Sequence, residues 1–126
     1  MDVFYKPNAA SQSTSEAFVG ALQGVAMEWS GLRAVLPLDA VNHAAGLGVT
    51  ISTGATPNTV QANELALAFF SAPGQTPSGV TGGYTTAVSF SGLLAAYKSI
   101  SAIGSQSSTA TITSDFWSGA IATFRT

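Results

Sequence analysis

The stretch Glu64-Leu65-Ala66-Leu67-Ala68-Phe69-Phe70-Ser71 decides the fold class of this chain. Six consecutive apolar residues stand between a carboxylate and a serine, and a proline and a glycine follow at Pro73 and Gly74. A short apolar run bounded by turn-forming residues is typical of a strand that is covered on both faces. We therefore predict that residues 64–71 form the central strand, with Leu65, Leu67 and Phe69 in the core.

Strand and turn patterns continue on both sides of this run. Residues 47–53 alternate Leu47, Val49 and Ile51 with glycine, threonine and serine, which predicts a half-buried strand. Residues 72–83 are dense in glycine and proline and predict a surface loop, and residues 31–46 predict a long connection with one helical turn near Asp39. Further strands are predicted at residues 2–6, 84–91, 93–100, 108–113 and 117–124.

Residues 16–30 allow two interpretations. Val25, Met27 and Trp29 alternate with small or charged residues, which predicts a strand in the second half of this segment. A helix over residues 16–29 is the alternative, because alanine, leucine, methionine and glutamate favour helices.

The composition agrees with short strands joined by tight turns. The chain has 30 Ser or Thr, 13 Gly and 5 Pro among its 126 residues, and only 8% of the residues are charged. A chain of this length supports one hydrophobic core. About seven or eight short strands with glycine-rich turns indicate a sandwich or a barrel. Of these we expect a single all-β domain over residues 1–126, an antiparallel β-sandwich, Ig-like or jelly-roll-like.

Charge and hydropathy exclude several partners. The formal net charge is −2, and the basic residues Lys6, Arg33, Lys98 and Arg125 are far apart in the sequence, so no stretch could follow nucleic-acid phosphates. No window reaches the roughly 18 consecutive apolar residues of a membrane span, and no signal peptide is visible at the N-terminus. The chain has no cysteine, so disulfides and thiolate chemistry are absent.

No catalytic or metal-binding constellation is visible. His43 is the only histidine, and Asp39 four residues earlier is too little for a metal site, which needs three or four ligands, so we expect both to be exposed loop residues. Ser89-Phe90-Ser91-Gly92 lacks the first glycine of a nucleophile elbow, and residues 79–83 lack the lysine of a phosphate loop. The carboxylates are expected at solvated strand ends and turns: Asp2, Glu16, Glu28, Asp39, Glu64 and Asp115. We predict no catalytic residues, no cofactor and no metal ion.

Aromatic side chains are the remaining candidates for ligand binding. Carbohydrate-binding sandwiches use such side chains as platforms for sugar rings, but a small domain needs most of them in its core. Core positions are therefore expected for most of the set Trp29, Tyr84, Tyr97, Phe116 and Trp117. Tyr84, beside the glycine-rich loop, and Trp117 are the candidate ligand-binding residues.

Packing and turn motifs along the whole chain carry a family resemblance. They are Phe4-Tyr5-Lys6, Glu28-Trp29-Ser30-Gly31-Leu32, Pro37-Leu38-Asp39, Asn63 to Phe70, Gly83-Tyr84-Thr85, Ala96-Tyr97-Lys98, Ser108 to Thr111 and Trp117 to Phe124. With these motifs the chain resembles β-sandwich domains of bacterial secreted proteins and of phage virion or tail proteins. Such domains usually begin with further strands ahead of the Phe-Tyr segment, so this chain looks like a domain without its usual N-terminal strands.

The resemblance implies a non-catalytic structural or interaction module, extracellular or on a virion surface. Missing strands would leave a sheet edge unpaired, so we expect self-association through sheet edges, with copies of the chain or neighbouring domains as partners. The alternative is a carbohydrate-binding module that uses aromatic residues near residues 72–83.

Overall fold

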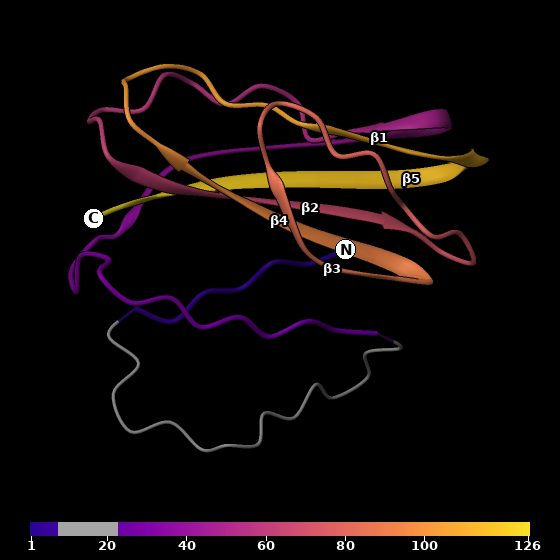
Figure 1. Cartoon of the computed structure of the whole chain (residues 1–126), viewed down its shortest axis with the longest axis horizontal. Coiled ribbons are helices and arrows are strands. Elements are labelled where there is room, and N and C mark those ends of the chain that lie inside the picture. Colours follow the sequence, from indigo (N-terminus) through magenta and orange to yellow (C-terminus); the bar gives the residue numbers. More distant parts are fainter. Residues whose placement is uncertain (8–22) are drawn as a thin grey trace.

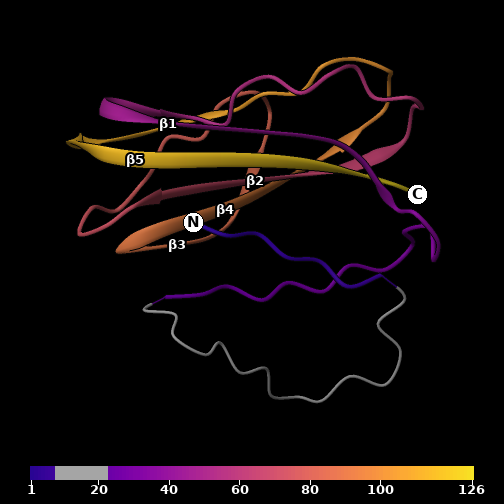
Figure 2. The ribbon, with the colours of Figure 1, turned by 180° about the vertical axis from the view of Figure 1, so that it is seen from behind.

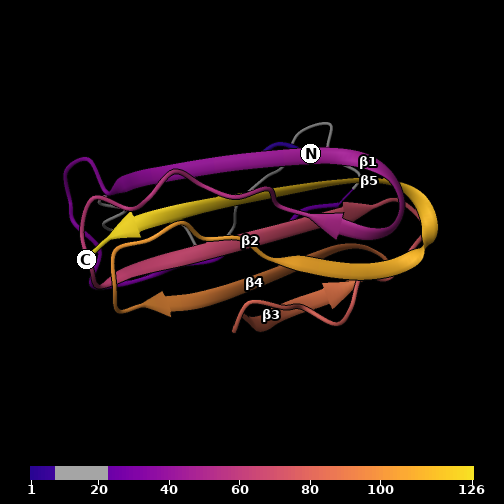
Figure 3. The same cartoon turned by 90° about the horizontal axis from the view of Figure 1, so that it is seen from above.

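A computed structural model describes residues 1–7 and 23–126, which contain five strands and no helix. The strands are β1 (Leu38–Ser52), β2 (Glu64–Ala72), β3 (Thr85–Phe90), β4 (Gly92–Ile100) and β5 (Thr109–Arg125). They form one antiparallel sheet in the order β1-β5-β2-β4-β3, which Figure 3 shows from above. The all-β, antiparallel prediction is confirmed, whereas the described residues form five strands in one sheet and not seven or eight in two.

The described residues form fewer strands than predicted, because two predicted strands are continuous with each other and another predicted strand does not form. The two strands expected at residues 108–113 and 117–124 are one continuous strand, β5. The long connection expected over residues 31–46 is wrong from Leu38 onward, because β1 begins there. Residues 2–6 do not form the expected strand.

The segment before β1 is extended without joining the sheet. Residues 24–30 alternate in exposure, with Val25, Met27 and Trp29 on the more buried side, as the strand interpretation predicts. They belong to no β-ladder, and residues 23–29 are not helical. The rest of this interpretation, residues 16–22, lies outside the described residues.

The prediction for the central strand is confirmed. β2 pairs along its length with β4 on one side and with β5 on the other, so both of its edges are satisfied. Leu65 and Leu67 are buried on one face and Phe70 on the other, but Phe69 is only half-buried, so its predicted core position holds only in part. The apolar run is therefore covered on both faces, as its composition requires.

Different parts of the chain cover the two faces of the sheet (Figure 1). The connections 53–63, 73–84 and 101–108 lie over one side, here called the loop face, and the largest fully buried apolar side chains there are Ile51, Phe70, Leu94 and Ile121. Residues 1–7 and 23–36 lie below the other side, here called the N-terminal face (Figure 2). Met27, Trp29 and Leu32 pack there on Leu65, Leu67, Ala122 and Phe124.

Three threonines at a spacing of three residues hold the connections together over the loop face. Thr53, Thr56 and Thr59 are buried, and their backbone N–H groups donate to the carbonyls of Ser108, Gln106 and Gly104 at 3.0, 2.9 and 3.2 Å. The N–H groups of the same three partners donate back to the threonine Oγ1 atoms at 3.0, 2.9 and 3.2 Å. Each threonine thus satisfies two backbone groups of a connection that belongs to no regular strand.

A glycine reverses the side-chain pattern of β1. Gly48 has φ of +145°, a conformation that residues with a side chain rarely adopt, and the pairing with β5 shifts register between Gly48 and Thr50. As a result Leu47 is exposed, whereas Ile51 is fully buried. The prediction that Leu47, Val49 and Ile51 share one buried face is therefore wrong for Leu47 and Val49.

Candidate functional site

The two edges of the sheet differ in their protection (Figure 3). β3 has six residues, and its pairing with β4 shifts register between Thr86 and Val88. β1 has 15 residues and contains no lysine, arginine, glutamate or proline. Edge strands bind further strands unless they are short, bulged, charged or interrupted by proline. β3 is short and bulged, whereas β1 keeps an unbroken run of paired residues between two register shifts, and its outer edge pairs with no strand among residues 1–7 and 23–126. This outer edge, here called the free edge of β1, is the candidate site for pairing with another strand.

The most regular part of this edge is residues 41–48, which pair without interruption with residues 115–122 of β5. Register shifts bound this part on both sides, between Leu38 and Val41 and between Gly48 and Thr50. A strand that docks on β1 would find its longest unbroken row of backbone groups here.

An apolar stripe lies on the N-terminal face beside this edge. It consists of Val41, Ala45 and Leu47 of β1 and Phe116 of β5, which the register places opposite Leu47. Val41, Leu47 and Phe116 are 54%, 66% and 71% exposed. The core position expected for Phe116 is therefore wrong. The sequence gives no signal of this exposure, because alternation shows that a strand has two faces but not which part of a face stays uncovered.

His43 and Asp39 lie on β1 and not in a loop. His43 is exposed between Val41 and Ala45, and its backbone N–H donates to Asn42 Oδ1 at 2.7 Å. The Asp39 side chain is only 1% exposed and bonds to other residues than His43. The structure therefore does not bring the two together as an acid–base pair, and the expectation of an exposed Asp39 is wrong.

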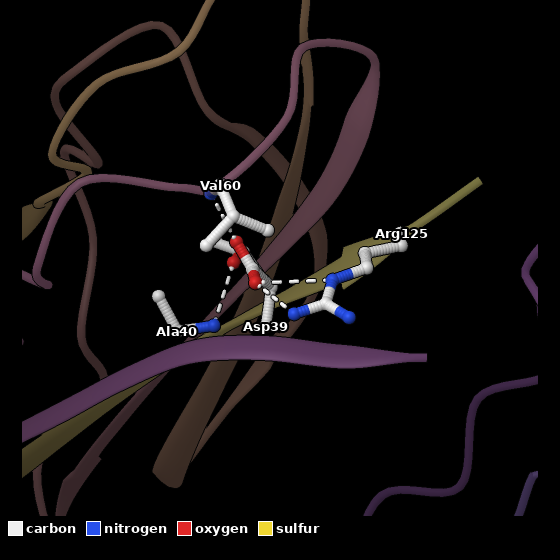
Figure 4. A network of polar contacts seen from close by, with 5 residues as sticks. Asp39, Ala40, Val60 and Arg125 are labelled. Carbon is white, nitrogen blue, oxygen red and sulfur yellow. Dashed lines mark hydrogen bonds and ion pairs between the residues drawn. The ribbon is translucent and has the colours of Figure 1, made fainter. Parts of the chain in front are cut away.

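Asp39 is the centre of a polar network that joins three parts of the chain (Figure 4). Its Oδ2 accepts from the backbone N–H of Val60 at 2.8 Å, and its Oδ1 accepts from Arg125 Nε at 3.0 Å and pairs with Arg125 Nη2. Beside it, the N–H of Ala40 donates to Thr123 Oγ1 at 3.1 Å. Burial alone would raise the pKa of Asp39, but the hydrogen bonds from Arg125 and Val60 outweigh it and hold that pKa below its ordinary value.

Glu64, the first residue of β2, is the second carboxylate near this network. It is 2% exposed, and neither carboxylate oxygen has a hydrogen-bond partner among the described residues. Burial, and next the negative charge of Asp39, raise its pKa, and the nearby Thr123 hydroxyl opposes this only in part. The expectation of a solvated strand-end carboxylate is therefore wrong for Glu64. The position of this glutamate directly before the apolar run was the one available signal.

The two aromatic candidates lie on the loop-face side of the sheet. Tyr84 is 8% exposed, its hydroxyl has no partner among the described residues, and Lys98 Nζ lies 5.5 Å from the centre of its ring. Burial raises the pKa of Tyr84 to about 12. Trp117 is half-buried, and its indole packs against the backbone of Gly46 so closely that a side chain at Gly46 would clash with it.

A cavity of about 350 Å³ opens at the end of the sheet where β2 begins and β4 ends. Trp29 lines it together with the hydroxyl and amide side chains of Ser30, Asn63, Ser99 and Thr126. The Trp29 indole packs on Tyr97 with a distance of 5.0 Å between the ring centres. The cavity therefore combines an aromatic surface with groups that form hydrogen bonds.

The residues considered for catalysis are separated. Ser89 lies on β3, at the opposite edge of the sheet from His43, and its Oγ donates to the Pro77 carbonyl at 2.8 Å. Within residues 1–7 and 23–126, no group of three or more histidine, aspartate or glutamate side chains is arranged to hold a metal ion. The same residues contain no helix long and apolar enough to cross a membrane.

Comparisons with models of protein families, with curated proteins and with solved structures found no match to this chain.

Proposed function

We propose that this chain is a non-catalytic structural or interaction module of an extracellular or virion surface assembly, and that it associates with copies of itself through a sheet edge. The observation that carries this proposal is the free edge of β1, which is 15 residues long and has no lysine, arginine, glutamate or proline to protect it. The one carboxylate of β1, Asp39, forms an ion pair with Arg125.

Surface composition supports the proposal. Only 8% of the residues are charged, so copies of the chain repel one another weakly, and the apolar stripe lies beside the same edge. The resemblance to domains of secreted and virion proteins supports the location. The two-layered sandwich also belongs to the proposal: Met27, Trp29 and Leu32 cover part of the N-terminal face as a second layer.

Sedimentation velocity over a concentration series tests the proposal. Wild-type protein is expected to form dimers or larger species at micromolar concentrations. Ala45→Lys puts a charge in the middle of the β1 edge and is expected to shift association to at least tenfold higher concentration. Ala87→Lys, the same change at an exposed position in β3, is the matched control and is expected to leave association unchanged. A wild-type monomer at several hundred micromolar would overturn the proposal.

Carbohydrate binding is a second candidate, and the cavity beside Trp29 is the observation that favours it. Indole rings stack on sugar rings, and hydroxyl and amide groups bond to sugar hydroxyls. Titration calorimetry with a panel of oligosaccharides would test it on wild type, Trp29→Ala and Tyr84→Phe. Binding lost in Trp29→Ala alone supports the cavity. Binding lost in Tyr84→Phe alone would place the ligand near residues 72–83, and no binding at millimolar concentration would remove this candidate.

A further inference from the structure

We infer that the partner of the β1 edge is a second copy of β1, paired antiparallel about a two-fold axis that lies midway between the two copies of Ala44. This inference rests on the proposed self-association and adds to it a partner strand, an orientation and a register. In this arrangement residues 41–47 of one copy lie opposite residues 47–41 of the other, and the two sheets become one continuous sheet of ten strands.

Regularity of the edge and the positions of its apolar side chains together select this register. β1 pairs evenly with β5 only over residues 41–48, and the shifts on both sides change the direction of the neighbouring backbone groups. Opposed residues of an antiparallel pair must point to the same face of the sheet, so a two-fold axis perpendicular to the sheet lies midway between the two copies of one residue. Axes at Ala44 and at Ala45 overlap residues 41–47 and residues 42–48, so the even part alone allows both registers. An axis at Ala45 would place Leu47 opposite His43 and Val41 opposite Val49, beyond the register shift, so the apolar side chains favour the axis at Ala44.

The apolar stripe is self-complementary in this register. Val41 of one copy lies opposite Leu47 of the other, and this contact occurs twice because the axis repeats it. The row across the seam then reads Phe116, Leu47, Val41 of the second copy and Ala122 of the second copy. Cross-strand neighbours at this spacing contact each other, so the 54% and 66% exposed side chains of Val41 and Leu47 gain apolar partners.

Charge favours a second copy over a charged peptide. The paired residues 41–47 include one titratable side chain, His43, and in this register it lies opposite Ala45 and not opposite the other His43. The flanking Asp39 is occupied by Arg125 and the N–H of Val60. Apart from His43, the edge therefore has no ionisable side chain available to select an acidic or basic partner, and no like charges lie directly opposite each other in the symmetric pair.

Single cysteines test the register directly, since the chain has none of its own. Opposed residues of an antiparallel pair have Cα atoms about 4.5–5.5 Å apart, which suits a disulfide. The same residue in the two copies is about 20 Å apart at positions 41 and 47, because six residues separate it from its partner position at about 3.3 Å per residue. A mixture of Val41→Cys and Leu47→Cys is therefore expected to form a disulfide-linked heterodimer under mild oxidation, while each variant alone is not.

The pair His43→Cys and Ala45→Cys repeats the test at the next opposed positions and covers the case in which losing Val41 or Leu47 weakens association. Sedimentation of wild type distinguishes a wrong register from a lack of self-association. If wild type associates but neither mixture cross-links above its single variants, the register is overturned and self-association remains. Cross-linking of Val41→Cys alone would likewise overturn the register. A monomeric wild type would overturn both proposals.

Discussion

Arg125 at the end of β5 holds the buried carboxylate of Asp39 at the start of β1, with Nε 3.0 Å from Oδ1. The same carboxylate accepts a hydrogen bond from the N–H of Val60. The Asp39 side chain therefore connects the edge strand β1 both to β5 and to the connection 53–63. The Asp39 side chain is 1% exposed, so its loss would leave the guanidinium and the N–H without their acceptor.

Asp39→Ala is therefore expected to destabilise the fold by about 3 kcal/mol, at the lower end of the range for a broken buried ion pair, since Arg125 is partly exposed and can reach water. Denaturant titration measures this loss. Asp2→Ala removes an exposed carboxylate and is expected to change stability by less than about 0.5 kcal/mol. A loss below 1 kcal/mol for Asp39→Ala would show that the pair contributes little.

Glu64 is expected to make the fold less stable as the pH rises. Its pKa in the folded state is raised from the ordinary value of 4.5, so its contribution is fully present below that value and is lost as the pH rises through the folded pKa. Glu64→Gln cannot ionise, so the variant should gain stability over wild type with increasing pH above 4.5. Urea midpoints measured from pH 4 to pH 9 test this, and parallel curves for the two proteins would contradict it.

Asp39 has the opposite pH dependence. Its pKa is lowered from 3.8, so its contribution is present above that value and is lost as the pH falls through the folded pKa. Wild type is therefore expected to lose more stability than Asp39→Asn between pH 4 and pH 2. Thermal melts of both proteins in this range check the sign, and an equal loss in the two would exclude Asp39 as its source.

Two leucines on the same face of the sheet are expected to differ strongly. Leu67 in β2 is buried, and Leu67→Ala should cost about 2–5 kcal/mol through lost transfer energy and a residual cavity. Leu47 in β1 is mostly exposed, so Leu47→Ala should cost less than about 0.5 kcal/mol when measured at concentrations where the chain is monomeric. Similar losses for both variants in denaturant titrations would mean that the N-terminal face is covered more evenly than the described residues show.

The hydrogen bonds of the buried residues Thr53, Thr56 and Thr59 predict that the hydroxyl of each threonine contributes more to stability than the shape of its side chain. In Thr56→Val the N–H of Gln106 loses its buried acceptor, which should cost about 1–3 kcal/mol. Thr56→Ser keeps the hydroxyl and is expected to lose less than Thr56→Val. Equal stability of the two variants in urea would show that water replaces the threonine oxygen.

Tyrosine ionisation, followed by absorbance at alkaline pH, reports on Tyr84. Its pKa is raised to about 12 by burial, so it should ionise near pH 12. Tyr84→Phe should remove the transition at this pH and should not lower stability, because the buried hydroxyl has no partner among the described residues. A titration of Tyr84 near pH 10 would show that its ring is open to solvent.

The sequence by itself determined what local pattern and composition control. The apolar run of residues 64–71 predicts a central strand because only a strand with neighbours on both sides can bury both faces, and β2 confirms it. The alternation of Thr109, Ala110, Thr111, Ile112 and Thr113 likewise gives the observed burial, since a strand turns successive side chains to opposite faces.

Only the tertiary structure decided which side chains are covered. Leu47 and Leu67 are both predicted to be buried, yet Leu47 is exposed and Leu67 is buried, because coverage depends on where distant segments such as residues 23–36 lie. Asp39 and Glu64 are buried because β1, β2 and β5 bring them together from positions 25 residues apart in the sequence. Burial and charge pairing of this kind arise from long-range contacts, and a local pattern has no access to them.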